Sequence, residues 1–318
     1  MSKMNSFEAT YGGDGWSPRT LSLHEELGTL WGACGIDSEW APLKKVLLHS
    51  PGEELMASMD DYDAAQMLEP LDVPKARAQH EDMAAAYEKL GIEVFYIEPD
   101  EPATPNQMFV ADLMAATPEG VIIARPASTV RAGEERWAAR CLGDIGVPIV
   151  KSVRGNGTFE GADAMWLRPD VAIVGRGLRT NDEGAAQVAS ILAEMGVEVV
   201  QVDQPFGSMH LMGSLRFADQ NLGLAYPNRL AHRAVEALKR CGIEVAFVPR
   251  TDELRTGSAF NFVCLGPREI LMPAGNPKTQ ASFESLGIKC HTVDVSELRK
   301  AAGAVGCLTG IVEREFVG

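Results

Sequence analysis

Hydrophobic and polar positions follow one order of segments that returns five times along the chain. In each unit, apolar residues spaced three or four positions apart precede a glycine, a β-branched residue and a short apolar run. This order predicts an amphipathic helix, its left-handed end and a β-strand. The predicted helices cover residues 75–90, 133–145, 183–195, 230–241 and 279–286, and the glycine-led strands cover 91–97, 146–152, 196–202, 242–248 and 287–293.

A second series of short apolar runs lies between these units, and each run is closed by proline or glycine. Such runs predict buried strands, here at 46–50, 121–126, 171–177, 222–227 and 269–275. A doubly wound sheet also alternates strands and helices, and helix–glycine–strand units resemble one another by chance. Neither alternative requires five polar stretches at similar offsets. We therefore predict an α/β fold, a five-bladed pseudo-symmetric α/β propeller with one central cavity.

Each polar stretch carries one ionisable or amide side chain among glycine and apolar neighbours. These residues follow their glycines by 14 to 21 positions, and they are Asp112, Glu160, His210, Asn261 and Cys307. Taken singly, an aspartate after a strand often caps a turn, and a buried histidine or amide often satisfies the backbone. Their shared offset in five radial units instead predicts that they converge on one site.

The chain has 318 residues, and we predict one propeller domain over 1–318. Residues 1–40 fall outside the repeat and are expected to form an N-terminal extension. Residues 49–70 lengthen the first unit, and we interpret them as a substrate lid or as a plain surface insertion.

Composition narrows the functional classes. The net charge is −15 without a basic stretch, which argues against nucleic acid and anionic membranes as partners and is compatible with a small cationic substrate. No apolar run approaches the roughly 18 residues of a membrane helix, and the N-terminus lacks a signal-peptide core. The six cysteines form no CxxC pair, so neither a zinc site nor a disulfide framework is indicated. We expect a cytoplasmic protein and, from base rates alone, a homo-oligomer, with a dimer as the guess.

The five polar residues predict nucleophilic chemistry. A cysteine nucleophile needs a base or a stabilised thiolate, and His210 is the obvious partner of Cys307. Glu160 can orient the imidazole, whereas a buried Asp112 would need a cationic, planar ligand with several donors, such as a guanidinium or amidinium. We also expect an activated Cys307 to react with thiol reagents near neutral pH far faster than the other five cysteines.

Four motifs resemble those of the guanidino-group modifying superfamily of arginine deiminases, dimethylargininases and amidinotransferases. They are "PNQMFVAD", "FEGAD", "MHLMG" and "GAVGCLT", and the resemblance covers roughly residues 40 to 318. It implies the five-bladed pentein fold and a reaction that needs no metal and no organic cofactor.

The resemblance also implies the residue roles. Cys307 is the nucleophile, His210 the general acid and base, Glu160 orients the guanidinium and Asp112 holds its nitrogens. Arginine or an N-methylated arginine would pass through a covalent thiouronium intermediate to citrulline and an amine. Arginine deiminase and amidinotransferase activities use the same set and stay open, and a non-catalytic binder of guanidino compounds is the alternative from another class.

Three further residues are candidates for binding the substrate. Arg131 and Arg179 resemble arginines that bind the substrate carboxylate in dimethylargininases, although ion pairs with Glu134 or Glu183 would also explain them. Asn261 is expected to contact the substrate or the backbone.

Two departures from the family pattern concern the substrate. Met212 stands where arginine deiminases have an aspartate, which favours a substrate with an alkylated nitrogen. Asn106 stands where dimethylargininases tend to have an aspartate for the α-ammonium group, and Ala111 also departs from the usual residue. The substrate class therefore stays between free, N-methylated and other guanidino compounds.

Overall fold

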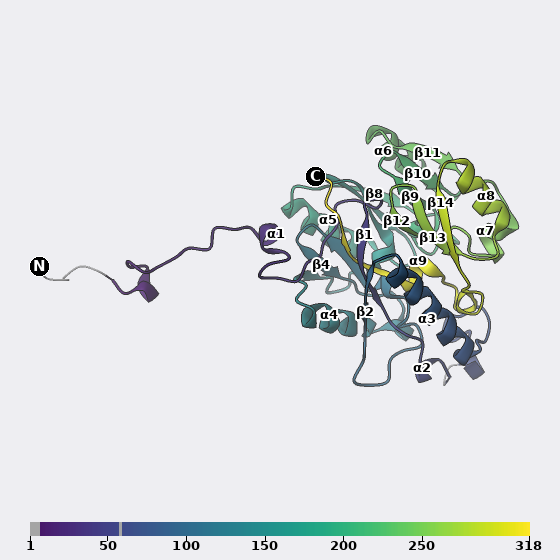
Figure 1. Ribbon diagram of the computed structural model, residues 1–318, viewed down its shortest axis with the longest axis horizontal. Helices are drawn as coiled ribbons and strands as arrows, with labels where there is room; N and C mark the ends of the chain where they lie inside the picture. The colour runs from purple at the N-terminus through teal and green to yellow at the C-terminus, as the bar shows by residue number, and fades with distance from the viewer. Residues whose placement is uncertain (1–6, 57–58) are drawn as a thin grey trace, which may run out of the picture.

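The computed structural model describes residues 7–56 and 59–318, and its strands form five separate three-stranded sheets (Figure 1). The first sheet contains β15, β1 and β2, and the others contain β3 to β5, β6 to β8, β9 to β11 and β12 to β14. The strands are β1 Leu43–Leu48, β2 Glu93–Tyr96, β3 Met114–Thr117, β4 Gly120–Ile123, β5 Ile149–Ser152, β6 Ala164–Arg168, β7 Val171–Arg176, β8 Glu198–Asp203, β9 Leu215–Asp219, β10 Leu222–Ala225, β11 Glu244–Phe247, β12 Val263–Gly266, β13 Glu269–Pro273, β14 Lys289–Val293 and β15 Gly310–Arg314.

All five sheets have one topology. The middle strand pairs antiparallel with one neighbour and parallel with the other. One helix connects each parallel pair: α3 Val73–Lys89, α4 Glu134–Asp144, α5 Asp182–Glu194, α6 His232–Arg240 and α8 Pro277–Ser285. The glycine after each helix has a φ of +75° to +79°, the left-handed conformation that ends a helix. The predicted five-bladed α/β propeller is confirmed.

The middle strands of the blades are largely buried. Every residue of β4 and of β10 is buried, because a parallel pair is covered by its crossover helix on one face and by neighbouring blades on the other. This double coverage explains why these strands read as uninterrupted apolar runs in the sequence.

The sequence patterns did not reveal the third strand of each blade. The antiparallel strands β3, β6, β9, β12 and β15 lie at the ends of the stretches that we interpreted as polar connections. Most are four or five residues long and begin directly after a short turn, so their own pattern is too short to distinguish from a loop.

The two ends of the chain meet in one blade. Val46 of β1 lies opposite Ile311 of β15 on one side and opposite Val94 of β2 on the other. The last strand therefore closes the ring, and Cys307 lies just before it. The chain continues past β15 to its C-terminus, where Gly318 N donates to Asp37 Oδ2 at 2.9 Å; Figure 1 marks this end near α5.

The predicted N-terminal extension, residues 1–40, has two parts, and residues 1–6 lie outside the described residues. The first part extends away from the blades, and α1 Leu23–Glu26 lies at its end nearer the body; Tyr11 and Trp16 of this part are exposed (Figure 1). The second part packs on the body, where Gly35 N donates to Val312 O at 2.8 Å and Asp37 accepts from the N–H of Val317.

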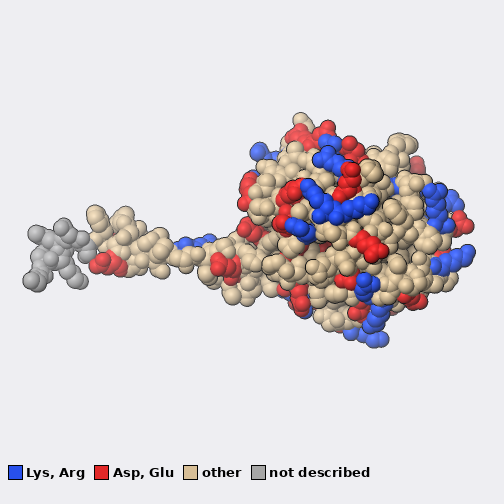
Figure 2. All heavy atoms as spheres, turned by 90° about the horizontal axis from the view of Figure 1, so that it is seen from above, with Lys and Arg blue, Asp and Glu red and all other residues tan. Residues whose placement is uncertain are grey.

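The remaining elements are short. They are the helices α2 Glu53–Met56, α7 Asp252–Thr256 and α9 Val305–Leu308, and the 3₁₀ turns η1 Ala9–Tyr11, η2 Met59–Asp61, η3 Val110–Asp112, η4 Thr129–Arg131, η5 Gly161–Asp163, η6 Leu211–Gly213 and η7 Leu298–Ala301. Acidic and basic side chains are interspersed over the face in Figure 2. Among the described residues, no helix has the length and apolar character needed to cross a membrane.

Candidate active site

The five predicted residues occupy equivalent places in the five blades. Each lies just before the antiparallel strand that begins its blade: Asp112 ends η3 before β3, Glu160 precedes η5 and β6, His210 precedes η6 and β9, Asn261 precedes β12, and Cys307 lies in α9 before β15. The turn η3 packs against both η5 and α9, and η5 packs against η6. Radial repetition therefore brings these short turns together at the centre of the ring.

Three of these side chains form a buried acid–imidazole cluster. His210 Nε2 is 2.6 Å from Glu160 Oε2 and 3.7 Å from Asp112 Oδ1. All three side chains are buried. A shared hydrogen bond in a low-dielectric site fixes both the imidazole and the carboxylate in place.

The charges of this cluster shift its pKa values strongly. Burial alone would lower the pKa of His210, but the nearby Asp112, Glu160 and Asp163 outweigh it and raise the pKa to about 9. Burial opposes ionisation of Glu160, yet the hydrogen bond from His210 and the nearby cations lower its pKa to about 2. The imidazolium–carboxylate pair is therefore the dominant state near neutral pH, and His210 is set to donate a proton.

Asp163 accepts a hydrogen bond from the turn that follows His210. We did not predict this residue from the sequence. Its carboxylate accepts from Leu211 N at 2.8 Å, from Thr180 Oγ1 at 2.6 Å and from Gln204 Nε2 at 2.6 Å. Because Leu211 follows His210 directly, these bonds fix the backbone that carries the imidazole. The signal was present in "FEGAD", where Asp163 lies three residues after Glu160, on the same turn.

Cys307 is held by Asn261. The amide of Asn261 donates to Cys307 Sγ at 2.8 Å, and its oxygen accepts from Cys307 N at 3.0 Å. A Cβ on Gly303 would lie 2.2 Å from the ring of Phe109 and 3.1 Å from Cys307 Cβ. A glycine is therefore required at Gly303 for the nucleophile loop to approach this closely.

Burial raises the pKa of the Cys307 thiol, and the charge of Asp112 raises it further, whereas Asn261 and Arg216 act in the opposite direction. The free protein therefore carries a neutral thiol at neutral pH. Fast labelling of Cys307 is consequently expected only when a cation compensates Asp112, which revises the expectation of a thiolate in the resting site.

Arg131 lies inside the cluster. Its guanidinium Nη1 is 2.6 Å from Asp112 Oδ2 and 3.6 Å from Glu160 Oε2, and its Nε donates to Glu134 Oε2 at 2.9 Å. The ion pair with Glu134 that we considered is present, but it is buried and not on the surface.

Arg179 lies at the edge of the same cluster. Its Nη1 is 3.2 Å from Glu160 Oε1. Its partner is thus Glu160 and not the Glu183 that we considered.

A small cavity of about 20 Å³ connects these groups. Its lining includes six of the predicted site residues and Gln66, Phe109, Met209, Ala301, Ala302 and Gly303. The six predicted members are Asn106, Asp112, Arg131, Arg179, His210 and Cys307.

One residue of the region 49–70, Gln66, lines this cavity, and its neighbour Ala65 contacts the lining residue Asn106. Asn106 donates to Ala65 O at 2.8 Å, and Gln66 Nε2 donates to Ser128 Oγ at 2.6 Å. This region therefore reaches the cavity, with residues 57 and 58 lying outside the described part of the chain.

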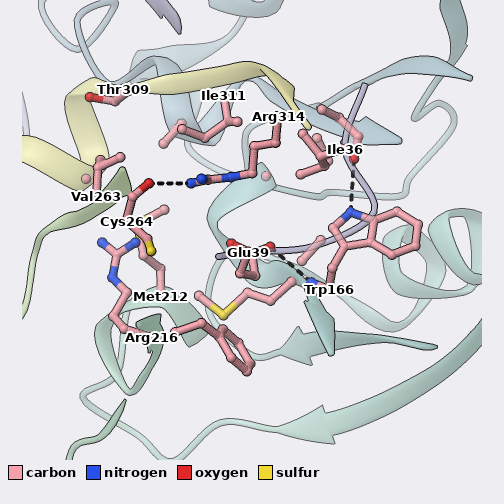
Figure 3. Close-up of a pocket in the computed structure, with 18 of the residues that line it drawn as sticks. Ile36, Glu39, Trp166, Met212, Arg216, Val263, Cys264, Thr309, Ile311 and Arg314 are labelled. Carbon is pink, nitrogen blue, oxygen red and sulfur yellow. Dashed lines mark hydrogen bonds between the residues drawn. The ribbon is translucent and has the colours of Figure 1, made fainter. Parts of the chain in front are cut away.

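Met212 lies elsewhere, which corrects its assignment to the substrate pocket. Its side chain lines a second, deeper cavity with Glu39 and Arg216 (Figure 3) and packs in an apolar cluster. Met209 is the methionine at the cavity beside Cys307. The 3₁₀ turn after His210 directs the side chain of Met212 toward the core. The spacing of residues in the sequence does not reveal this direction.

One group of potential metal ligands occurs among the described residues. Asp112, Glu160 and His210 each offer one ligand atom, and these atoms lie within 4.8 Å of one another. The guanidinium of Arg131 already contacts both carboxylates, and a protonated His210 cannot bind a metal. These residues therefore fit an organic cation better than a metal ion.

This chain is similar to known proteins in both sequence and fold. The family model described as arginine deiminase matches residues 53–240. N(G),N(G)-dimethylarginine dimethylaminohydrolase of Pseudomonas aeruginosa is 28% identical over 268 residues, which cover 84% of this chain and 98% of that protein.

Two solved structures extend the comparison. A dimethylarginine dimethylaminohydrolase of Pseudomonas aeruginosa, a cysteine-to-serine mutant complexed with citrulline, superposes with a TM-score of 0.70 at 25% identity and covers 86% of this chain and all of that one. SxtG, an amidinotransferase from Microseira wollei, shares the fold at a TM-score of 0.71 and 14% identity over 89% of this chain and 97% of that one. With its motifs, its five blades and the match over more than half of its length, this chain belongs to the arginine deiminase family of the guanidino-group modifying superfamily.

Proposed function

We propose that this protein is a hydrolase that attacks the guanidino carbon of an N-methylated arginine, or of arginine, and releases citrulline and an amine. One observation carries the proposal: the carboxylates of Asp112 and Glu160 both lie within ion-pair distance of one guanidinium, that of Arg131. Asp112 and Arg131 line the same cavity as Cys307 and His210. The spacing of these carboxylates thus suits the functional group of the substrate.

The first half of the reaction uses all four residues. Asp112 and Glu160 hold the substrate guanidinium, and its positive charge compensates Asp112 and favours the Cys307 thiolate. The thiol proton of Cys307 passes to solvent, and the thiolate sulfur forms a bond to the guanidino carbon. The bond from that carbon to the leaving nitrogen breaks, and His210 supplies the proton that the departing amine takes.

The second half returns the enzyme to its starting state. His210, now neutral, accepts a proton from water as the water oxygen bonds to the carbon of the thiouronium intermediate. The carbon–sulfur bond then breaks and the proton of the carbon-bound hydroxyl passes to the sulfur. This step restores the Cys307 thiol and leaves a ureido product, citrulline. The residues require no metal and no organic cofactor for these steps.

Substrate binding requires Arg131 to leave Asp112. Its remaining partner Glu134 lies at the start of α4 and can retain the guanidinium through Nε and Nη2. Arg131 and Arg179 would then present N–H groups to the substrate carboxylate, and the region around Gln66 would cover the cavity as a lid. Asn106 would accept from the α-ammonium group.

Arginine deiminase activity is the second candidate. The family model and the neutral Asn106 favour it, and Met212, which lines the deeper cavity, no longer argues against an unsubstituted guanidinium. The two activities differ in the leaving group, which is ammonia for arginine and methylamine or dimethylamine for the methylated substrates.

Mass spectrometry of the products tests the proposal. Wild type, Cys307→Ser and the control Cys290→Ser, which changes a half-buried thiol on β14, are each incubated with arginine, monomethylarginine and asymmetric dimethylarginine, with and without glycine. We expect citrulline plus the methylated amine from wild type and the control, and a loss of at least about 1,000-fold in Cys307→Ser.

Each other product has a defined meaning. Ammonia and citrulline from arginine alone would make the protein a deiminase, and a glycine-dependent guanidino product would make it an amidinotransferase. Equal activity of wild type and Cys307→Ser would exclude the covalent mechanism. The intact mass of wild type quenched during turnover should show one adduct, located on the peptide that contains Cys307.

A further inference from the structure

Arg216 is a buried cation on the opposite side of the nucleophile loop from the substrate cavity. It lies in β9, is 8% exposed, and lines the deeper cavity of about 90 Å³ (Figure 3), whose lining includes residues of β3, β6, β9, β12 and β15. Its Nε and Nη2 have no hydrogen-bond partner, and it takes part in none of the ion pairs found among the described residues. An uncompensated buried guanidinium is costly and calls for a nearby negative charge.

The guanidinium lies directly against the loop that carries Cys307. A Cβ on Gly306 would lie 2.1 Å from Arg216 Nη2 and 3.0 Å from its Cζ. The same Cβ would lie 2.9 Å from the Asn261 oxygen, and Asn261 itself bonds Cys307. The ring of Phe262 supports the other side of the cation, 5.5 Å from its Cζ. Because Gly306 has no side chain, the guanidinium of Arg216 can approach the loop that carries Cys307 at this position.

The charged side chains around Cys307 differ in whether they already have a partner of opposite charge. Asp112 faces the thiol and opposes its ionisation. Arg131 and Arg179, which line the same cavity, are paired with carboxylates, and His210 is bonded to Glu160. Arg216 has no such pairing.

The groups that face Arg216 are weak counter-charges. They are Cys307, Glu39, Tyr87 and Cys264. Burial raises the pKa values of Glu39 and Tyr87, and it raises that of Cys264 to about 11, so all three ionise less readily than usual. The Cys307 thiolate, once formed, is thus a suitable partner for the guanidinium.

We propose that Arg216 is a positioning residue for the nucleophile, whose buried positive charge, held against Gly306, stabilises the thiolate of Cys307 from the axial side. The proposal rests on the proposed function for its catalytic meaning, since it assigns a role toward that nucleophile. It does not require that the substrate be known.

Alkylation of Cys307 by iodoacetamide measures this effect directly, because the thiolate is the reacting form. Its rate is followed from pH 6 to 10 by mass spectrometry of the peptide that contains Cys307, in wild type, Arg216→Met and Arg216→Lys. We expect Arg216→Met to raise the apparent thiol pKa by about one unit, which makes alkylation near neutral pH about tenfold slower. Lysine keeps the charge and should restore most of the rate.

Two controls separate charge from fold. Arg240→Met removes an exposed arginine of α6 that pairs with Glu198, so it should leave the alkylation profile unchanged. Circular dichroism reports whether each variant is folded, and Arg216→Gln replaces the methionine variant should that one fail to fold. A wild-type profile in the neutral variants would overturn the proposal, as would a lysine variant that behaves like methionine.

Turnover distinguishes this proposal from the proposed function. If wild type converts a guanidino substrate, the kcat/KM profile of Arg216→Met should move to higher pH by the same shift. If wild type converts none, the alkylation shift still supports the role of Arg216 while the proposed function fails. Turnover that requires Cys307, with an alkylation profile insensitive to the charge at position 216, would support the function and exclude the role of Arg216.

Discussion

His210 and Cys307 are controlled by carboxylates and cations that act in opposite directions on the two groups. The carboxylates that keep His210 protonated, Asp112 above all, also oppose ionisation of the Cys307 thiol. The reactive pair of thiolate and imidazolium is therefore a minor form of the free site, and a cationic substrate increases its population. This arrangement limits side reactions of the nucleophile in the absence of substrate.

Asp163 provides a test of this balance at the residue scale. Asp163→Asn keeps an oxygen for Leu211 N–H but removes a negative charge near His210, so we expect the pKa of His210 to fall from about 9 by about one unit. We expect this fall in the pKa of His210 because Asp163 is ionised above about pH 6, burial having raised its pKa to about 6. NMR titration of the imidazole measures it.

Asp163→Ala is the matched variant. It also leaves the Leu211 N–H without an acceptor, and we expect it to lower the free energy of unfolding by about 1–3 kcal/mol more than Asp163→Asn does. An unchanged His210 titration in Asp163→Asn would show that the carboxylate acts only as a hydrogen-bond acceptor.

The short turns before the first strand of each blade are the elements that build the site. Each turn carries one functional side chain, and neighbouring turns touch across blades. At η5, a Cβ on Gly161 would lie 1.9 Å from Met114 O and 2.5 Å from Ala111 O. Because the two backbones approach this closely, the turns that carry Glu160 and Asp112 lie in contact. This contact explains why the acid motif has a glycine directly after Glu160.

Gly161→Ala should therefore be among the more damaging small substitutions. The methyl group meets backbone oxygens that cannot rotate away, so we expect a loss of about 1–3 kcal/mol or more in the free energy of unfolding. Gly143 in α4 has no heavy atom within 4 Å of its hypothetical Cβ, and Gly143→Ala should be neutral or stabilising by up to about 1 kcal/mol. Urea denaturation of both variants measures the difference, and equal midpoints would contradict this account.

Two properties belong to the molecule as a whole: the closure of the ring of blades and the strong negative net charge. Because β15 pairs with β1, the loop that carries Cys307 leads directly into the strand that closes the ring. The net charge of −15 surrounds a site that we propose binds a cation. A field of this sign attracts a cationic substrate over distances that salt screens.

Ionic strength should therefore change substrate capture. We expect kcat/KM for a methylated arginine, with one net positive charge, to fall several-fold between low salt and about 0.3 M potassium chloride. The inhibition constant of citrulline, which carries no net charge, should change much less and is the control. Equal salt dependence of the two constants would argue that the field of the protein does not guide the substrate.

The sequence by itself determined the repeat, the helices with their glycine ends, the buried middle strands and the five residues that follow their glycines at similar offsets. These features depend on local periodicity and on glycine conformations, which are written in consecutive residues. Only the tertiary structure decided what each side chain meets: Met209 and not Met212 at the cavity, Arg131 on Asp112, and Arg216 behind Cys307. Those contacts join blades that are distant in sequence, and the direction of a side chain at a short turn follows from packing rather than from spacing.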